Sequence, residues 1–173
     1  MELLNLQVVR EYGGVFLHGL LITVLLTGIV IVLAGTLAIP IAVARLAKLR
    51  LVRWPADWYV EFIRATPLIL QLIYIYYVLP GAGIRLAPFT AAVLGLTLNY
   101  AAYMSEVYRS GIQSVPRGQR EAAESLGLRR LPILTQIILP QAIRMVLPAL
   151  GNYLIALFKD TALASVVTVQ ELM

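Results

Sequence analysis

The sequence has no cysteine, a single histidine, and charged residues at only 13% of its 173 positions. Without cysteine the chain forms neither disulfide bonds nor thiolate metal sites, and His18 alone makes no metal centre. Soluble domains carry about 25% charged residues. Here hydrophobic residues reach 60% and the mean hydropathy is +0.84. This composition predicts an integral membrane protein that has no metal site.

Four largely apolar stretches are long enough to cross a bilayer. Crossing the hydrocarbon takes about 20 apolar residues in a helix, because only an internally hydrogen-bonded backbone is stable there. We predict one all-α membrane domain over residues 1–173 with four transmembrane helices. The spans are predicted at residues 15–44, 57–80, 86–108 and 140–160, with a loop at 109–139 before the last of them.

The basic residues are sorted by loop, which predicts the orientation of the spans. Four follow the first span, one lies between the second and third spans, and six lie between the third and fourth spans or at the start of the fourth. Short cytoplasmic loops are rich in lysine and arginine, so the first and third connections are predicted to be cytoplasmic and the N-terminus outside. The net charge of +5 is therefore not evidence for nucleic-acid binding, which would need a basic groove with aromatic residues.

The third connection contains the segment EAAESLGLRRLPILTQIILP, residues 121–140. Ser114 is a plausible N-cap with Pro116 in the first turn, and strong helix formers follow. Gly127 is placed to end this helix in the left-handed region, after which the chain re-enters the membrane. Ala122 and Ala123 offer a small surface for another protein. An interfacial helix attracted to anionic lipid explains the same pattern equally well.

The spacing of this segment resembles the EAA motif of ABC importer membrane subunits at every fixed position. Glu121-Ala122-Ala123 is followed by three residues, Gly127, nine residues, and Ile137-Ile138-Leu139-Pro140. Three further segments resemble the polar amino acid permeases of that superfamily, the histidine, glutamine and arginine type. They are YVEFIRATPLILQL (59–72), YRSGIQSVPRGQREAAESLGL (108–128) and KDTALASVVTVQEL (159–172).

The resemblance implies a type I ABC importer-like bundle in a bacterial inner membrane. Glu121, Ala122, Ala123 and Gly127 would then belong to a coupling helix that receives work from a cytoplasmic ATP-binding cassette ATPase. The other implied partners are a second permease subunit, identical or homologous, a periplasmic or extracellular amino-acid-binding protein, and membrane lipid. The chain itself would be no enzyme and would need no cofactor, since ATP is bound by the partner, and no GxxxxGK[ST] pattern occurs in the sequence.

The resemblance also implies a fifth span after VQELM, so we expect a fragment or a truncated gene product. Which amino acid is carried does not follow from the sequence.

Polar and ionisable residues within spans are expensive and are therefore candidates for a substrate pathway. A zwitterionic amino acid needs donors for its carboxylate and acceptors for its ammonium group, and Lys159 and Asp160 could supply one each. The candidates are Arg64, Thr66, Gln71, Asn99, Tyr103, Met104, Asn152, Lys159 and Asp160, and Tyr100 and Tyr153 are further polar positions that could face a cavity.

Structural explanations compete with each of these assignments. Arg64 could form an interfacial ion pair with Glu61, Glu106 could pair with Arg109, and Lys159 with Asp160 could anchor the outer surface. Single polar residues more often bond between helices. A self-contained ion-coupled secondary transporter or channel is the alternative function. A membrane enzyme is less favoured, because no nucleophile and base stand together.

Overall fold

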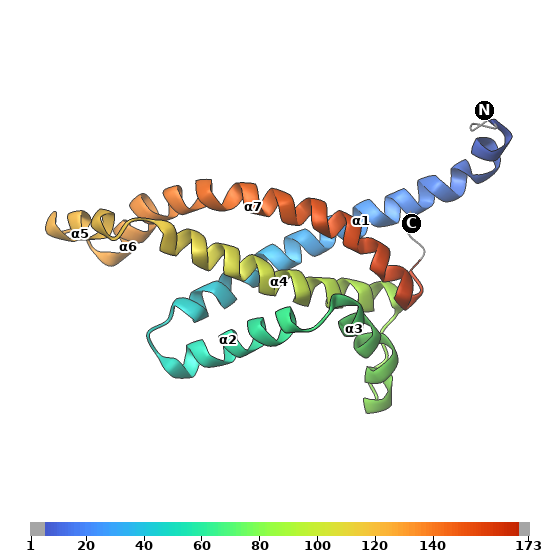
Figure 1. Cartoon of the computed structure of the whole chain (residues 1–173), viewed down its shortest axis with the longest axis horizontal. Coiled ribbons are helices and arrows are strands. Elements are labelled where there is room, and N and C mark those ends of the chain that lie inside the picture. The colour runs from blue at the N-terminus through green and yellow to red at the C-terminus, as the bar shows by residue number, and fades with distance from the viewer. Residues whose placement is uncertain (1–5, 170–173) are drawn as a thin grey trace.

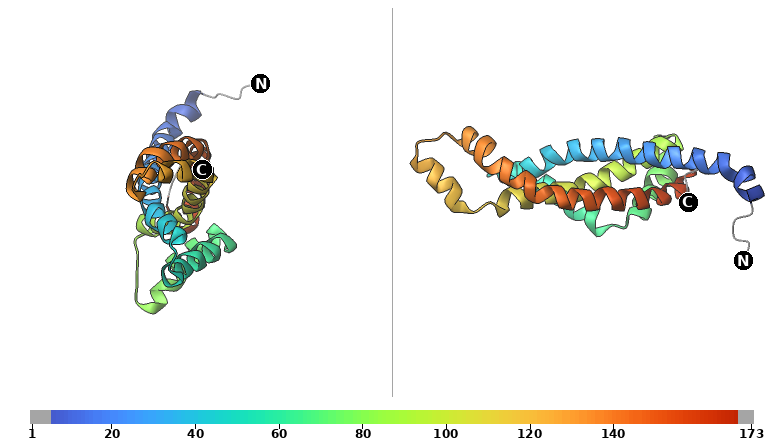
Figure 2. Two further views of the ribbon diagram at one scale, coloured as in Figure 1. Left: turned by 90° about the vertical axis from the view of Figure 1, so that its left-hand side faces the viewer. Right: turned by 90° about the horizontal axis from the view of Figure 1, so that it is seen from above.

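The apolar stretches fold into long helices that form an elongated bundle, shown in Figures 1 and 2. The computed structural model describes residues 6–169, and side chains from residue 13 onward; no strand occurs in that part of the chain. The all-α prediction is confirmed. The α-helices are α1 (Leu6–Leu46), α2 (Arg50–Ala65), α3 (Leu68–Ile73), α4 (Pro88–Ser114), α5 (Arg117–Ser125), α6 (Arg130–Pro132) and α7 (Leu139–Asp160). The π and 3₁₀ segments are η1 (Tyr74–Val78), η2 (Leu79–Ala82), η3 (Ile133–Ile138) and η4 (Thr161–Val167).

Two helical segments among the described residues are long and apolar enough to cross a membrane, Gly13–Leu46 and Arg130–Val167. A third qualifies if α2 and the segment Leu68–Ala82, which are bent by 103° relative to each other, count as one span. The predicted span at 57–80 is therefore not one straight helix. The residue before a proline avoids the helical region, and Thr66 before Pro67 has an extended backbone with φ −106° and ψ 128°.

Helix α4 is the centre of the bundle and contacts α1, α2, α3 and α7. It corresponds to the predicted third span and is long enough to cross a membrane. It is less apolar than the segments Gly13–Leu46 and Arg130–Val167. Its buried polar side chains, Thr97, Asn99 and Ser105, explain the difference, because they face other helices and not lipid. Tyr59 of α2 donates a 2.7 Å hydrogen bond to the carbonyl of Leu98, which ties α2 to the middle of α4.

Close contact between α4 and α7 depends on Gly111. A Cβ atom at this position would lie 2.2 Å from Cγ2 of Val146, well inside van der Waals contact. The backbones approach closely here because glycine has no side chain.

The loop predicted at 109–139 is largely helical. Helix α4 continues to Ser114, and the last helical segment begins at Arg130, ten residues before the predicted start at 140. Proline is tolerated in a first helical turn, which accommodates Pro132, and the π-turn η3 precedes Pro140, which lacks the N–H that a regular helix would use. Ser114 does not cap α5, because Pro116 is its N-cap residue and the Ser114 hydroxyl donates to the Gly111 carbonyl instead.

Candidate functional site

Helix α5 and its turn lie at one end of the bundle, far from α3 and η4 at the other end (Figure 1). Gly127 has φ +75°, so the predicted left-handed stop is confirmed. The Gly127 N–H donates to the Glu124 carbonyl at 3.0 Å, and the Leu128 N–H donates to the Ala123 carbonyl at 3.1 Å. This pair of bonds is a Schellman motif, which satisfies carbonyls that the helix end would otherwise leave unpaired.

One side of α5 is buried within the chain and the other is exposed. Ala123 is 2% exposed and belongs to an apolar cluster with Ile133 and Ile138 of η3. Glu121 and Ala122 are exposed, so only one of the two predicted small residues is available to another protein. Leu126, which the sequence reasoning missed, is 81% exposed at the tip of the turn. An exposed apolar side chain beside a rigid turn was the signal that could have identified it.

A second candidate site is a cavity of about 380 Å³ where the break between α2 and α3 meets the middle of α4 and the end of α7. Its volume lies in the range of ligand pockets, about 300–1,000 Å³. Five of the predicted pathway residues line it. The lining residues are Arg64, Ala65, Thr66, Pro67, Leu68, Asn99, Tyr100, Tyr103, Tyr153, Ala156 and Asp160.

The cavity contains one anion and one cation from different helices. Tyr100 donates a 2.7 Å hydrogen bond to Oδ2 of Asp160, and among the described side chains Oδ1 of Asp160 has no donor. The guanidinium carbon of Arg64 lies 5.4 Å from the centre of the Tyr103 ring, a cation–π contact. Arg64 lines the cavity and forms no ion pair with Glu61 or any other described carboxylate.

Three tyrosine rings form the wall between these two charges. The Tyr153 ring centre lies 6.3 Å from that of Tyr100 and 6.0 Å from that of Tyr103. Tyr100 and Tyr153, two of the polar positions expected to face a cavity, are both part of this wall. Ring faces and hydroxyl groups together suit a ligand that is part polar and part apolar.

Gln71 lies behind the cavity and holds the helix break in place. Its side-chain amide donates 2.9 Å hydrogen bonds to the carbonyls of Ile63 and Thr66, where α2 ends. The Ile63 carbonyl also accepts from the Thr66 N–H at 3.4 Å. Its carbonyl oxygen accepts a 3.2 Å hydrogen bond from Asn99. Gln71 is therefore buried and bonded within the chain, while Asn99 both contacts it and lines the cavity.

The three other predicted pathway residues do not line the cavity. Met104 is 3% exposed in the core between α1 and α4. Asn152 and Lys159 are exposed on α7, and Lys159 lies next to Asp160 in sequence but outside the cavity. Within the described residues, no group of three or more His, Cys, Asp or Glu side chains could hold a metal ion.

Comparison with known proteins gives matches along most of the chain. Residues 34–173 match the family described as "Binding-protein-dependent transport system inner membrane component". A protein of Sinorhizobium fredii, "Probable amino-acid ABC transporter permease protein", is 49% identical over 157 residues, which cover 91% of this chain and 68% of that protein. An L-cystine transport system permease protein of Bacillus subtilis is 41% identical over 163 residues, covering 94% of this chain and 70% of that protein.

A solved structure shares the fold at high similarity. It is described as "Crystal structure of an amino acid ABC transporter with histidines", and it matches with a TM-score of 0.90 and 38% identity over 95% of this chain and 77% of that chain. The chain thus spans 68% to 77% of the length of these three proteins. It is membrane-embedded and belongs to the binding-protein-dependent transport family, among the amino-acid ABC transporter permeases.

Proposed function

We propose that this chain is the membrane-spanning subunit of an ATP-driven importer that moves polar amino acids across a bacterial inner membrane. In this proposal the N-terminus is outside and α5 is cytoplasmic, as the basic residues of the loops predict. The observation that carries the proposal is the cavity, which is lined by one guanidinium, one carboxylate and three tyrosine rings.

An amino acid fits this arrangement by its own charges. The substrate carboxylate would bind Arg64, which forms no ion pair with a described carboxylate, and the substrate ammonium group would bind Oδ1 of Asp160. Tyr100 holds the Asp160 carboxylate by its hydrogen bond, so the acceptor is positioned before the ligand arrives. The pair of charges makes the site selective for a zwitterion, because an anion or a cation alone would leave one protein charge unmatched.

The conformational change that drives transport would be transmitted from the ATPase through α5. Glu121, Ala122 and Leu126 are exposed and would contact a cytoplasmic ATPase, which binds the ATP, while the buried Ala123 fixes α5 to the rest of the chain. Helix α5 follows α4 with only Val115 and Pro116 between them, and α4 carries three cavity residues. Movement of α5 would thus be transmitted to the cavity wall.

The remaining partners follow from the same proposal. A second permease subunit would complete the translocation path, and an outer amino-acid-binding protein would deliver the substrate. Lys159 is exposed at the end of α7, close to where such a protein would dock, and its role in the pathway stays a prediction. The exposed apolar side chains of α1 would face lipid or the second subunit.

Uptake into proteoliposomes tests the proposal. The chain is reconstituted with the ATPase and binding protein that co-purify with it, and uptake of a panel of amino acids is measured with and without ATP. We expect ATP-dependent uptake that Asp160→Asn reduces strongly and Lys159→Gln reduces little. Uptake that proceeds without the ATPase on a proton or sodium gradient would instead establish an ion-coupled secondary transporter.

A further inference from the structure

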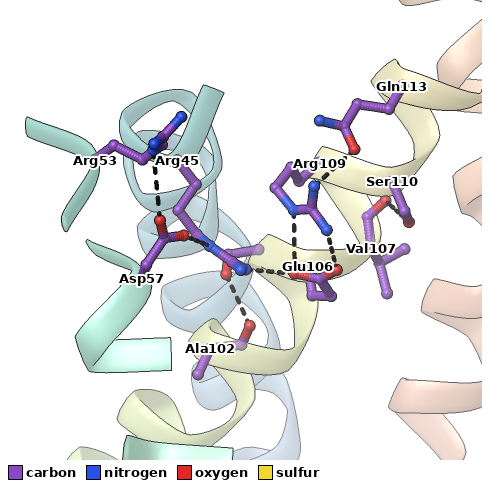
Figure 3. Close-up of polar contacts among 10 residues, drawn as sticks. Arg45, Arg53, Asp57, Ala102, Glu106, Val107, Arg109, Ser110 and Gln113 are labelled. Atoms are coloured by element: carbon purple, nitrogen blue, oxygen red, sulfur yellow. Dashed lines mark hydrogen bonds and ion pairs between the residues drawn. The ribbon is translucent and has the colours of Figure 1, made fainter. Parts of the chain in front are cut away.

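Four charged side chains from α1, α2 and α4 form a network outside the cavity. Arg45 of α1 donates from Nε to Oδ1 of Asp57 in α2 at 2.8 Å, and from Nη1 to Oε2 of Glu106 in α4. The Arg45 side chain is only 10% exposed, so it is enclosed between the two carboxylates that it binds. Figure 3 shows these side chains pointing toward one another from three separate helices.

Arg109 completes this group. It binds Glu106 through Nε at 3.2 Å and through Nη2 at 2.5 Å, and its Nη1 donates to Gln113 at 2.6 Å (Figure 3). We name Arg45, Asp57, Glu106 and Arg109 the ionic cluster. Both carboxylates in the cluster contact Arg45, and Glu106 is shared between two arginines. The predicted pairing of Glu106 with Arg109 is confirmed, but it is one part of a larger network.

The position of the cluster along α4 has a mechanical consequence. On this one helix the cavity residues Asn99, Tyr100 and Tyr103 come first, the cluster residues Glu106 and Arg109 follow within the next two turns, and then the connection to α5 begins. The cluster therefore ties α4 to α1 and α2 between the two candidate sites. Any displacement that passes from α5 to the cavity through α4 has to pass this point.

These four charged side chains cost free energy where they lie between α1, α2 and α4. Their presence therefore indicates that they specify one arrangement of the three helices. Enclosing charged side chains away from water is expensive, and replacing buried ion pairs by apolar side chains often leaves stability unchanged or improved. Removing Arg45 alone would leave the carboxylates of Asp57 and Glu106 near each other without their shared cation. They would repel, and α2 and α4 would separate where these two residues lie.

We propose that the ionic cluster is a latch that fixes α1, α2 and α4 to one another, and that it sets how many substrate molecules are transported per ATP hydrolysed. This rests on the proposed function, in which α5 receives work from an ATPase. With the latch closed, α4 moves as a rigid lever between α5 and the cavity. With the latch open, α5 moves while the cavity wall does not follow, and ATP is hydrolysed without transport.

Arg45→Gln is the test variant and Arg53→Gln is its matched control. Arg53 is also near Asp57, but it lies 3.8 Å from Oδ2 and its side chain is 47% exposed, so its loss should have little effect. ATP-driven uptake and ATP hydrolysis are measured in parallel in proteoliposomes. We expect Arg45→Gln to lower the ratio of uptake to hydrolysis by about fivefold or more, the lower range of typical coupling between sites, and Arg53→Gln to preserve it.

A second measurement reports on the latch without any partner protein. Because the chain has no cysteine, Lys48→Cys and Ser110→Cys allow spin labels to be placed only at the exposed ends of α1 and α4. We expect a narrow distance distribution in the parent and in Arg53→Gln, and a broad one in Arg45→Gln. If the Arg45→Gln protein does not assemble into the complex, Glu106→Gln replaces it. This variant removes the Glu106 charge with little change of side-chain shape, and both the transport ratio and the spin-label distances are measured for it.

The outcomes separate the latch from the proposed function. A parent complex without ATP-dependent uptake refutes the proposed function, and the spin-label distances then still test the latch as a structural joint. A parent complex that transports, with an unchanged ratio and an unchanged distance distribution in the latch variants, refutes the latch alone. Uptake and hydrolysis that fall by the same factor also refute it, because they indicate loss of active complex and not loss of coupling.

Discussion

Gly127 gives the sharpest test of the turn after α5. We predict that Gly127→Val abolishes ATP-driven transport while membrane insertion stays intact. A Cβ atom at Gly127 would meet nothing within 4 Å, so the substitution causes no collision. Its cost comes only from the backbone, because φ is +75° and side chains other than glycine are strained in that region.

The magnitude follows from this strain. A side chain held in the left-handed region costs about 1–3 kcal/mol, and a β-branched one lies at the upper end. A cost of about 2 kcal/mol reduces the population of the capped turn about 30-fold. That is enough to displace Leu126 and the end of α5 from the conformation in which they would contact an ATPase. It is small beside the burial of the long helices, so insertion is not affected.

A matched control removes the effect of adding a side chain. Gly118 lies within α5, just before the turn that contains Gly127. It also has open space around its Cβ position, and it has no positive φ. Gly118→Ala should leave transport unchanged or improve helix stability by up to about 1 kcal/mol. The loss of transport should increase from Gly127→Asn through Gly127→Ala to Gly127→Val, because asparagine tolerates the left-handed region best. Wild-type uptake by Gly127→Val in proteoliposomes would refute the account.

Three further outcomes follow from the geometry. Asp160→Asn should raise the substrate concentration for half-maximal uptake about tenfold, since a hydrogen bond to a charged group contributes about 1.5–3 kcal/mol, whereas exposed Lys159→Gln should change it little. Gly111→Ala should lower the thermal midpoint in detergent by crowding Val146, and adding Val146→Ala should restore it. Gln71→Met should destabilise the protein by about 1–3 kcal/mol; lost uptake with unchanged stability would contradict its structural role.

The sequence predicted the helices and the turn of α5 well, because their signals are local. Continuous apolar stretches define α1 and the last helical segment, and a glycine after a run of helix formers defines the left-handed stop. It also predicted the motif that places the chain in its family. The limits of the segments were less accurate. Helix ends depend on capping and on contacts with other helices, which explains why α4 extends to Ser114.

The break in the second span had a local signal that the prediction did not use. Thr66 before Pro67 marks a probable helix boundary, but hydropathy over 57–80 is high enough to indicate one span. The stabilising element is not local, since Gln71 reaches back to the carbonyls at the end of α2 and accepts from Asn99 in α4. Only the folded chain shows that this glutamine supports the break.

The Glu106–Arg109 pair within α4 was predicted, but the partners that charged residues find on other helices were beyond sequence reasoning. Glu61 is three residues before Arg64 and on the same helix, so an ion pair between them was the simplest expectation. In the structure Arg64 lies over the ring of Tyr103 on another helix. Arg45 counted only as a topology signal, yet it joins Asp57 and Glu106, which are far from it in sequence. Charge sorting by loop reports which side of the membrane a residue is on, not which partner it has.

Of the adjacent Lys159 and Asp160, which were predicted to supply one charge each for a substrate, only Asp160 lines the cavity, for a physical reason that bears on transport. Neighbouring residues on a helix point about 100° apart, so α7 directs Asp160 into the cavity and leaves Lys159 outside. The cation of the cavity comes instead from α2, through Arg64. Two charges on one helix would keep a fixed separation throughout a transport cycle. Charges on two helices change their separation whenever those helices move, so a zwitterion held between Arg64 and Asp160 would be bound and released by the same motion that opens the path.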